Sequence, residues 1–246
     1  MLKKMLPIVI AMLFVTTVIS CVVIAVTMMR SNAEIEDFEG FVALIQTEDN
    51  IQNHESGDTE AIFTRNLTPL YERNRDCIGW VCIPNTVVNY PVMHTPQDPQ
   101  KYLRKNFDCE YSSSGVPFLH ENNTLDSDNL IIYGHNMKNG TMFSDIIKYC
   151  EKSYCAEHPA IEWETKQGLK VYTVFAVVQV KDQDEWYRFI TAADEEDYEN
   201  RIKAISEASL YTSDIKPRYG QQLLTLSTCY GSSENDRLIV IAVEMN

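Results

Sequence analysis

The feature that most constrains this chain is a run of 23 residues without a charged side chain, from Pro7 to Met29. A helix of that length spans the roughly 30 Å hydrocarbon core of a bilayer. A cleaved signal peptide is the alternative, but its apolar part has only about 7–15 residues and ends at a small-residue cleavage site. This run is longer and has no clear Ala-x-Ala, so we expect residues 1–30 to be an uncleaved membrane anchor.

The charges around this run predict its orientation. Lys3, Lys4 and the α-amino group precede it, whereas an acidic segment follows Asn32. Basic residues favour the cytoplasmic side of a membrane, so the N-terminus is expected inside and the rest of the chain outside. Residues 1–30 hold three of the 21 basic residues and none of the 35 acidic ones. The remainder therefore carries a net charge of −17, which argues against a nucleic-acid partner.

The cysteines and acidic residues do not predict a metal site. Two pairs share the spacing Cys-x4-Cys, at Cys77/Cys82 and Cys150/Cys155. Cys77 and Cys82 flank or enter a predicted strand, where a separation of five turns two side chains to opposite faces. Disulfides remain open for a secreted chain. The acidic run at 194–197 is interpreted as a helix start and not as a calcium site, and no P-loop or dinucleotide motif indicates a cofactor.

The chain places a cysteine at the end of a predicted strand. Leu223 to Thr228 is apolar and β-branched, Cys229 follows, and a loop of Gly, Ser, Asn and Asp begins there. Arg237 then precedes a second apolar run, 238–243. A thiol beside a cation is a plausible nucleophile, because positive charge favours the reactive thiolate. A buried structural cysteine is the alternative at this position.

A histidine occupies the same kind of position upstream. The segment 129–143 contains a strand that ends in a Gly-bearing turn, with His135 at its exit. Rigid scaffolds often hold catalytic residues at such strand-to-loop junctions. The two segments together therefore favour a catalytic pair over two unrelated structural residues.

These motifs resemble those of class B sortases, which are cysteine transpeptidases of Gram-positive cell surfaces. The resemblance rests on "TLSTC" ending at Cys229 and followed by Arg237, and on "IIYGHNM" around His135. The segment from Ile78 to Met93, "IGWVCIPNTVVNYPVM", is similar to the first two strands of that fold. The similarity extends from about Leu67 to the C-terminus. Its order of His, Cys and Arg also matches.

The resemblance implies a mainly β fold, an eight-stranded mixed barrel with N-terminal helices and a helix in the loop before the cysteine-bearing strand. The expected organisation is an anchor with a short cytoplasmic tail at 1–30, a helical segment at 31–76 and the barrel domain at 77–246. The sequence pattern adds helices at 32–47 and 61–75, a linker at 48–60, and strands at 78–84, 86–93, 115–119, 160–165 and 169–181. The long connection 182–220 is expected to contain a helix that begins with a capping box from Thr191 to Asp194 and carries an apolar stripe at Tyr198, Ile202 and Ile205.

The resemblance also implies the chemistry and its residues. Cys229 would attack a sorting signal after its Thr and form a thioester, His135 would transfer protons, and Arg237 would steady the substrate or the oxyanion. The backbone N–H of Tyr230 is the expected second oxyanion donor. Further candidates for substrate contact are Asn85, Tyr90, Tyr133, Tyr187, Ser227 and Thr228. The family commonly has Asp where this chain has His120, which is interpreted as a loop residue.

The implied partners are surface proteins that carry sorting signals and an amine acceptor, either a peptidoglycan precursor or a pilin lysine. Two alternatives remain open. The first is a surface cysteine peptidase whose acyl-enzyme ends on water, although papain-like wall peptidases place Cys before His in the chain. The second is a membrane-anchored wall-binding module without catalysis, in which Cys229 is only a buried thiol.

Overall fold

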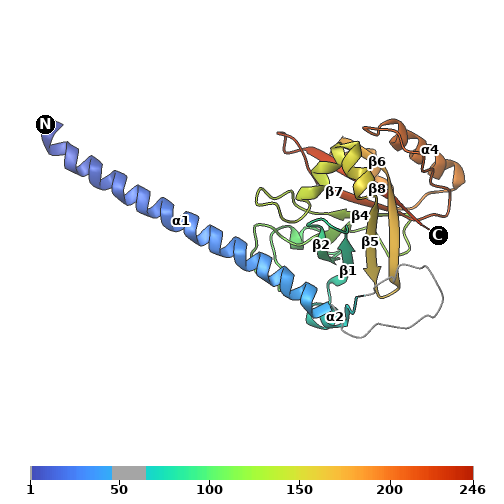
Figure 1. The fold of residues 1–246 in the computed structure, drawn as a ribbon, viewed down its shortest axis with the longest axis horizontal. Coiled ribbons are helices and arrows are strands. Elements are labelled where there is room, and N and C mark those ends of the chain that lie inside the picture. Colours follow the sequence, from blue (N-terminus) through green and yellow to red (C-terminus); the bar gives the residue numbers. More distant parts are fainter. Residues whose placement is uncertain (1, 46–64, 246) are drawn as a thin grey trace. The chain divides into compact units, whose positions relative to one another are not determined.

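The computed structural model describes residues 2–45 and 65–245 (Figure 1). It divides the chain into two compact units, Met1–Ala43 and Leu44–Asn246. The predicted linker at 48–60 and the start of the helix predicted at 61–75 lie outside the described residues.

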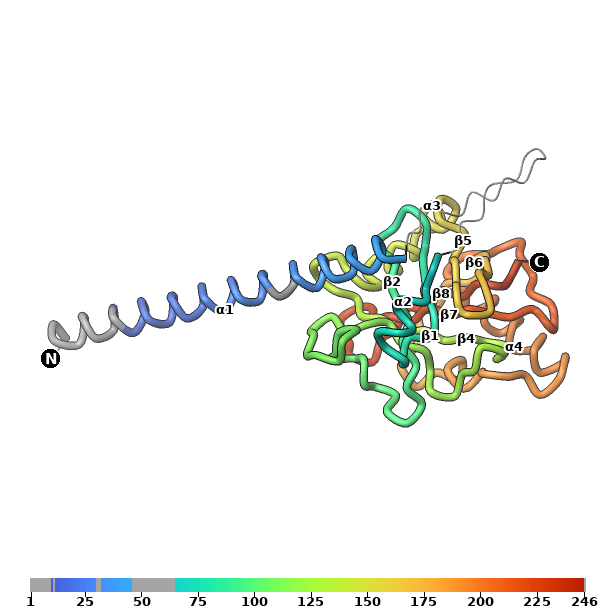
Figure 2. The backbone as a smooth tube through the Cα atoms, turned by 90° about the horizontal axis from the view of Figure 1, so that it is seen from below, coloured from blue at the N-terminus to red at the C-terminus, as the bar shows by residue number. Residues whose placement is uncertain are grey.

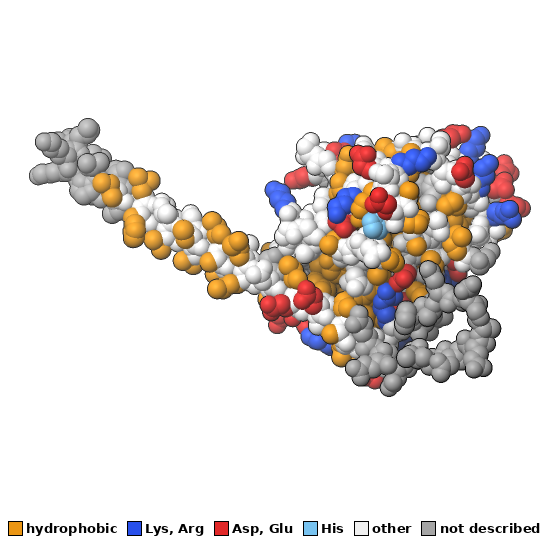
Figure 3. All heavy atoms as spheres, in the orientation of Figure 1, with side chains coloured by type: hydrophobic (Ala, Val, Ile, Leu, Met, Phe, Trp, Pro, Cys, Tyr) orange, Lys and Arg blue, Asp and Glu red, His pale blue; other side chains and the backbone are white. Residues whose placement is uncertain are grey.

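The N-terminal unit is one long helix, α1 (Leu2–Ile45). The anchor and the helix predicted at 32–47 are therefore continuous as far as Ile45, because between Pro7 and Ile45 the sequence has no further proline and only one glycine, Gly40, that would favour a break. The helix is long and apolar enough to cross a membrane. Figure 3 shows hydrophobic side chains, in orange, along the described part of this helix. Phe14, Val22 and Met29, for example, are each more than half exposed.

The second unit is a closed eight-stranded barrel, as predicted. A short helix, α2 (Thr68–Arg73), precedes it and begins next to Pro69. The strands follow one another around the barrel in the order β1-β2-β3-β4-β7-β8-β6-β5. Their bounds are β1 Cys77–Cys82, β2 Asn89–Met93, β3 Phe118–Leu119, β4 Asn129–Tyr133, β5 Ala160–Thr165, β6 Gly168–Lys181, β7 Leu223–Cys229 and β8 Asp236–Glu244.

The barrel is mixed because two of its strand pairs are parallel. These are β2 with β3 and β4 with β7, whereas the other pairs are antiparallel. The chain leaves β4, passes through β5, β6 and α4, and returns as β7 beside β4 (Figures 1 and 2). Parallel neighbours need such a long crossover, which explains the length of the connection between them.

The helical elements between the strands are short. They are the 3₁₀ segments η1 Lys101–Leu103, η2 Ser144–Cys150 and η3 Glu185–Arg188, and the helix α3 Lys152–Glu157. The sequence pattern also suggests short helices at 98–105 and 142–149; η1 lies within the first range and η2 overlaps the second. α3 was not expected from the sequence.

The longest helix of the barrel unit is α4 (Glu195–Glu207), which lies in the connection between β6 and β7. Its apolar stripe, Tyr198, Ile202 and Ile205, is buried, as predicted, in a cluster with side chains of the β6 and β8 strands. The predicted capping box is wrong by three residues. Asp194 is the N-cap, and its carboxylate accepts the N–H of Asp197 at 2.9 Å because the backbone of Asp194 is still extended.

A separate apolar cluster fills the interior of the barrel. It includes Trp163 and Tyr172 from β5 and β6, together with Leu224 and Leu226 from β7. On the same strand Leu223 belongs to the α4 cluster, as the alternation of side chains along a strand requires. β7 is therefore buried on both faces up to Thr228, and only its last residue, Cys229, is exposed.

Candidate active site

The parallel pairing of β4 and β7 sets the first two candidate residues side by side. Tyr133 lies opposite Ser227 in this ladder. His135 and Cys229 each follow two residues later, so both leave the barrel at the same edge. The N–H of Gly134 donates to the carbonyl of Ser227 at 3.1 Å and continues the pairing between the two exits.

Two further hydrogen bonds join the exits. The hydroxyl of Thr228 donates to the carbonyl of Gly134 at 2.7 Å, and the side-chain amide of Asn136 donates to the carbonyl of Cys229 at 3.3 Å. Gly134 itself has no room for a side chain, since a Cβ there would lie 2.6 Å from the ring of Phe143. Side chains of both segments thus hold the end of β4, with His135, against the end of β7, with Cys229.

The adjacent strand supplies the third residue. β8 pairs antiparallel with β7 and places Arg237 opposite Cys229. The Nη1 of Arg237 donates to the carbonyls of Glu234 at 2.6 Å and Asp236 at 2.9 Å. Its Nη2 lies 3.9 Å from the carboxylate of Asp182. These contacts hold the guanidinium in place without using its whole fork of donors.

The imidazole of His135 is oriented by the main chain. Its Nε2 lies 2.9 Å from the carbonyl oxygen of Leu103, at the end of η1. A carbonyl only accepts, so Nε2 carries the hydrogen and Nδ1 of the neutral ring is left to exchange a proton. Burial lowers the pKa of His135, the bond to Leu103 opposes this, and the charges of Arg104 and Arg237 lower the pKa further.

Cys229, His135 and Arg237 line one groove with a volume of about 760 Å³. The β2–β3 connection supplies part of its wall, and the residues after β3 supply another. Its remaining lining residues are Asp98, Pro99, Gln100, Leu103, Val116, Phe118, His120, Glu121, Tyr133, Gly134, Asp182, Tyr187, Ser227 and Thr228. The sequence motifs therefore converge on a single hollow large enough for an extended peptide.

Four of the six candidate substrate contacts line this groove: Tyr133, Tyr187, Ser227 and Thr228. The rings of Tyr133 and Tyr187 stack with centroids 5.8 Å apart. The hydroxyls of Tyr187 and Ser227 are hydrogen-bonded to each other at 2.8 Å. Burial raises the pKa of Tyr187 to about 12, so its hydroxyl stays protonated. This wall offers a peptide an aromatic surface.

The other two candidates do not line the groove. Tyr90 is buried, and its hydroxyl accepts the N–H of Met142 at 3.0 Å, so this side chain stabilises the barrel. Asn85 lies in the turn between β1 and β2 with a φ of 62°, a left-handed conformation that asparagine tolerates well. In the segment 78–93, Tyr90 therefore packs in a strand and Asn85 shapes a turn.

The backbone N–H of Tyr230 is already engaged. It donates to the carbonyl of Asp236 at 3.0 Å, as part of the link between β7 and β8. This N–H would have to turn away from Asp236 or share its hydrogen before it could stabilise an oxyanion. The arrangement described here is therefore one in which the second predicted donor is not free.

Sequence reasoning missed the groove residues that no motif marks. Leu103 acts through its carbonyl, which any residue type provides, and Asp98 and Asp182 belong to loops without a recognisable pattern. His120, interpreted from the sequence as a loop residue, also lines the groove. A departure from the family at that position was the one available signal.

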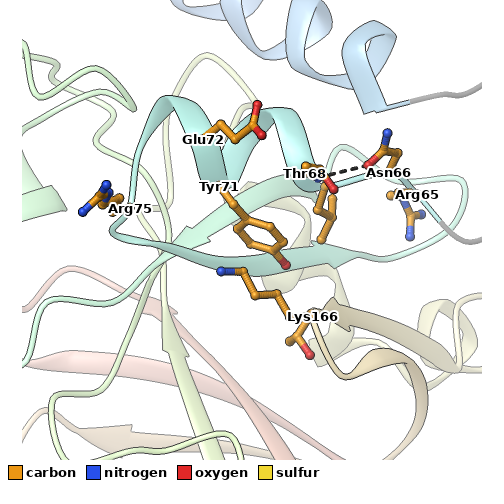
Figure 4. Close-up of a pocket in the computed structure, with 9 residues that line it drawn as sticks. Arg65, Asn66, Thr68, Tyr71, Glu72, Arg75 and Lys166 are labelled. Atoms are coloured by element: carbon orange, nitrogen blue, oxygen red, sulfur yellow. Dashed lines mark hydrogen bonds between the residues drawn. The ribbon is translucent and has the colours of Figure 1, made fainter.

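A second hollow of about 660 Å³ lies away from these residues, beside α2 (Figure 4). Its lining includes Tyr71, Arg75 and Lys166, with the ammonium of Lys166 4.6 Å from the ring centre of Tyr71. Arg65, at its margin, forms ion pairs with Glu162 and Glu164 at 2.6 and 3.2 Å. It contains none of the candidate catalytic residues.

Comparisons with known proteins agree with this fold. A model of the Sortase domain family matches residues 81–245. Sortase B of Listeria monocytogenes is 36% identical over 168 residues, which cover 66% of this chain and 66% of that protein. Sortase B of Staphylococcus aureus is 29% identical over 173 residues, 69% of this chain and 70% of that protein.

Solved structures give the same result. The X-ray structure of Clostridium perfringens sortase B superimposes with a TM-score of 0.69 at 30% identity, covering 74% of this chain and all of that one. A Staphylococcus aureus sortase B–substrate complex superimposes with a TM-score of 0.67 at 28% identity, covering 72% and 83%. The chain therefore belongs to the sortase family of cysteine transpeptidases and resembles its class B members.

Proposed function

We propose that this chain is a membrane-anchored class B sortase that transfers surface proteins to an amine through a thioester on Cys229. The observation that carries the proposal is the strand register, which brings His135, Cys229 and Arg237 from three neighbouring strands to one groove. A structural cysteine would not need a histidine and an arginine at the same barrel edge, nor would it be exposed in a groove.

In the proposed first step the sulfur of Cys229 attacks the backbone carbonyl that follows the Thr of a sorting signal. Nδ1 of His135 first takes the proton of the Cys229 thiol; as the thioester forms and the carbon–nitrogen bond breaks, Nδ1 gives this proton to the leaving amine. Arg237 donates hydrogen bonds to the carbonyl oxygen of the substrate while that oxygen carries negative charge. The N–H of Tyr230 joins it once the bond to Asp236 is released or shared.

In the second step an amine attacks the thioester carbonyl. His135 accepts the proton of the incoming amine, the new amide forms, and the thiolate leaves. The acceptor is a wall-peptide amine or a pilin lysine, and the donors are surface proteins with sorting signals. No metal or cofactor is required by this sequence of steps.

We also propose the topology that suits this role. α1 spans the cell membrane once with its N-terminus in the cytoplasm, and the barrel works outside. The length and apolar surface of α1 support the span, and the basic residues before it support the orientation.

The decisive experiment incubates the full chain in detergent with peptides carrying NPxTN-like and LPxTG-like signals, with and without amine acceptors. Mass spectrometry should detect a thioester on Cys229 and an amide product that contains the acceptor. Cys229→Ala should abolish the thioester, and His135→Ala should nearly do so. Products that end only on water, whatever the acceptor, would establish the peptidase alternative.

The non-catalytic alternative has a separate test. A thiol reagent at neutral pH should label Cys229, because the residue is exposed and lies opposite Arg237. Cys77 serves as the internal control, since it is buried and burial raises its pKa to about 12. Equal, slow labelling of both residues together with no thioester on any peptide would favour a wall-binding module.

A further inference from the structure

His120 is a groove residue with no assigned role. It follows β3 directly, lines the groove and has a side chain that is only 12% exposed. Its ring centre lies 6.0 Å from that of Tyr133, which stacks in turn on Tyr187. The imidazole is therefore held in place at the edge of the aromatic wall.

The hydrogen bonding of His120 fixes which nitrogen carries a hydrogen. The N–H of Asn122 donates to Nδ1 of His120 at 3.1 Å, so Nδ1 acts as an acceptor. The neutral ring then has its hydrogen on Nε2. Burial lowers the pKa of His120; the carboxylate of Glu121 opposes this and His94 adds to it, so the neutral ring predominates near pH 7.

The Nε2–H of this tautomer has no hydrogen-bond partner among the residues that the structure describes. Two other possible donors on the same wall, the hydroxyls of Tyr187 and Ser227, are already hydrogen-bonded to each other. A fixed, sheltered donor costs little entropy to use, and leaving it unpaired against a bound ligand is unfavourable. An acceptor on the bound peptide would give the Nε2–H of His120 its hydrogen-bond partner.

The neighbouring charge limits what that acceptor can be. Glu121 also lines the groove, and its carboxylate lies 3.7 Å from Nδ1 of His120. A ligand carboxylate would meet this like charge at short range. A neutral oxygen, such as a side-chain amide, meets no such repulsion and accepts from Nε2–H.

We propose that His120 is a specificity-determining residue, whose Nε2–H recognises a neutral oxygen acceptor on a side chain of the sorting peptide. This rests on the proposed function of the same groove. One neutral hydrogen bond in a sheltered site predicts about a five- to tenfold preference for a peptide that carries the acceptor over an isosteric one that lacks it.

The test is a competition between paired peptides. The full chain in detergent receives equal amounts of two sorting peptides that differ at one position before the Thr, with Gln in one and Met in the other. Hydroxylamine releases the acyl products, and mass spectrometry gives their ratio. Each position before the Thr is scanned in turn. The ratio is independent of how much of a variant is folded, because both peptides share one enzyme sample.

Wild type should favour Gln over Met about five- to tenfold at one position. His120→Leu should reduce that ratio to about one, and His120→Asp, which only accepts, should favour Lys over Met there. His158→Leu is the matched control, because His158 lies at the end of α3, outside the groove lining, and its variant should keep the wild-type ratio.

Two results would overturn the inference, and they are distinguishable. If thioesters form but the ratio is the same in wild type and His120→Leu, the groove is a sortase site in which His120 reads no side chain. If no peptide forms a thioester on Cys229 in any variant, the proposed function fails and this inference fails with it.

Discussion

The proposed proton-transfer residue, His135, is held by a main-chain oxygen. The carbonyl of Leu103 fixes the ring through Nε2, which is the task that a carboxylate or amide side chain performs in many cysteine enzymes. A neutral carbonyl adds no negative charge beside the imidazole. The pKa of His135 therefore stays low, because burial and the nearby arginines face no counter-charge of comparable effect.

Arg104 offers a direct test of this electrostatic balance. Its positive charge disfavours the imidazolium, so Arg104→Gln should raise the pKa of His135 and increase the protonated fraction at neutral pH. The limb of the pH profile of kcat/KM that belongs to His135 should move to higher pH. NMR titration of the ring proton gives the pKa directly.

Arg188→Gln is the control, because the side chain of Arg188 is exposed and pairs with the exposed Glu185. Its titration curve for His135 should match wild type. A pKa of His135 that falls or does not change in Arg104→Gln would show that the charge of Arg104 does not lower it.

Arg237 should not tolerate replacement by lysine. The guanidinium reaches the carbonyls of Glu234 and Asp236 with one nitrogen and leaves other donors for the substrate, whereas an ammonium cannot do both. We expect Arg237→Lys to lower kcat/KM by about 10²-fold or more, similar to the loss of one oxyanion donor. Steady-state transpeptidation with an unchanged unfolding temperature measures this. Near-normal turnover would mean that only the charge at this position matters.

At the scale of elements, the exit of β4 depends on Gly134. A Cβ there would overlap the ring of Phe143, which is fully buried. Gly134→Ala should therefore destabilise the fold by about 1–3 kcal/mol and shift His135 enough to reduce thioester formation strongly. Denaturant unfolding and single-turnover acylation measure the two effects.

Replacing Phe143 by leucine removes the ring that the new Cβ at position 134 would meet. The double variant Gly134→Ala/Phe143→Leu should therefore relieve the overlap. The double variant is expected to be more stable than the sum of the two single changes predicts. Strict additivity would show that the clash with Phe143 is not the reason for glycine at this position.

The start of α4 provides a paired test of the corrected cap. The carboxylate of Asp194 accepts the N–H of Asp197. Among the described residues, no hydrogen bond joins Thr191 to the first turn of α4. Asp194→Ala should lower the stability of the barrel unit by about 1 kcal/mol, and Thr191→Ala should leave it nearly unchanged. Thermal unfolding compares them. If Thr191→Ala destabilised the protein more than Asp194→Ala, the capping box predicted at Thr191 would be the correct one.

The sequence predicted elements better than the contacts between them. The apolar runs at 160–165 and 169–181 were strands with nearly the predicted bounds. β3 is much shorter than the strand expected at 115–119, because only Phe118 and Leu119 find partners in the barrel. Pairing depends on the tertiary arrangement, which the alternation of residues does not contain.

The same distinction applies to the site. Cys229, His135 and Arg237 could be chosen because their residue types and motifs carry the chemistry. The carbonyl of Leu103 could not, since a main-chain group leaves no trace in the residue type. Asn85 and Tyr90 lie within the segment 78–93 that resembles the first two strands of the family, and they proved to belong to a turn and a packed strand.

At the scale of the whole molecule, the barrel unit should not need the anchor. The compact unit that contains the barrel begins at Leu44, whereas the apolar run ends at Met29. Removing residues 1–30 should give a soluble protein that unfolds cooperatively and forms the thioester as fast as the full chain in detergent. Circular dichroism and single-turnover acylation compare the two. Aggregation or loss of cooperativity would place the anchor within the fold.

The parallel pairing of β4 with β7 also determines when activity can arise during folding. His135 and Cys229 are 94 positions apart, and β5, β6 and α4 all lie between the strands that bring them together. Contacts of such long range carry a large loop-closure cost and form slowly. A chain that is still emerging or only partly folded therefore holds Cys229 and His135 apart, and the proposed chemistry can begin only when the barrel closes.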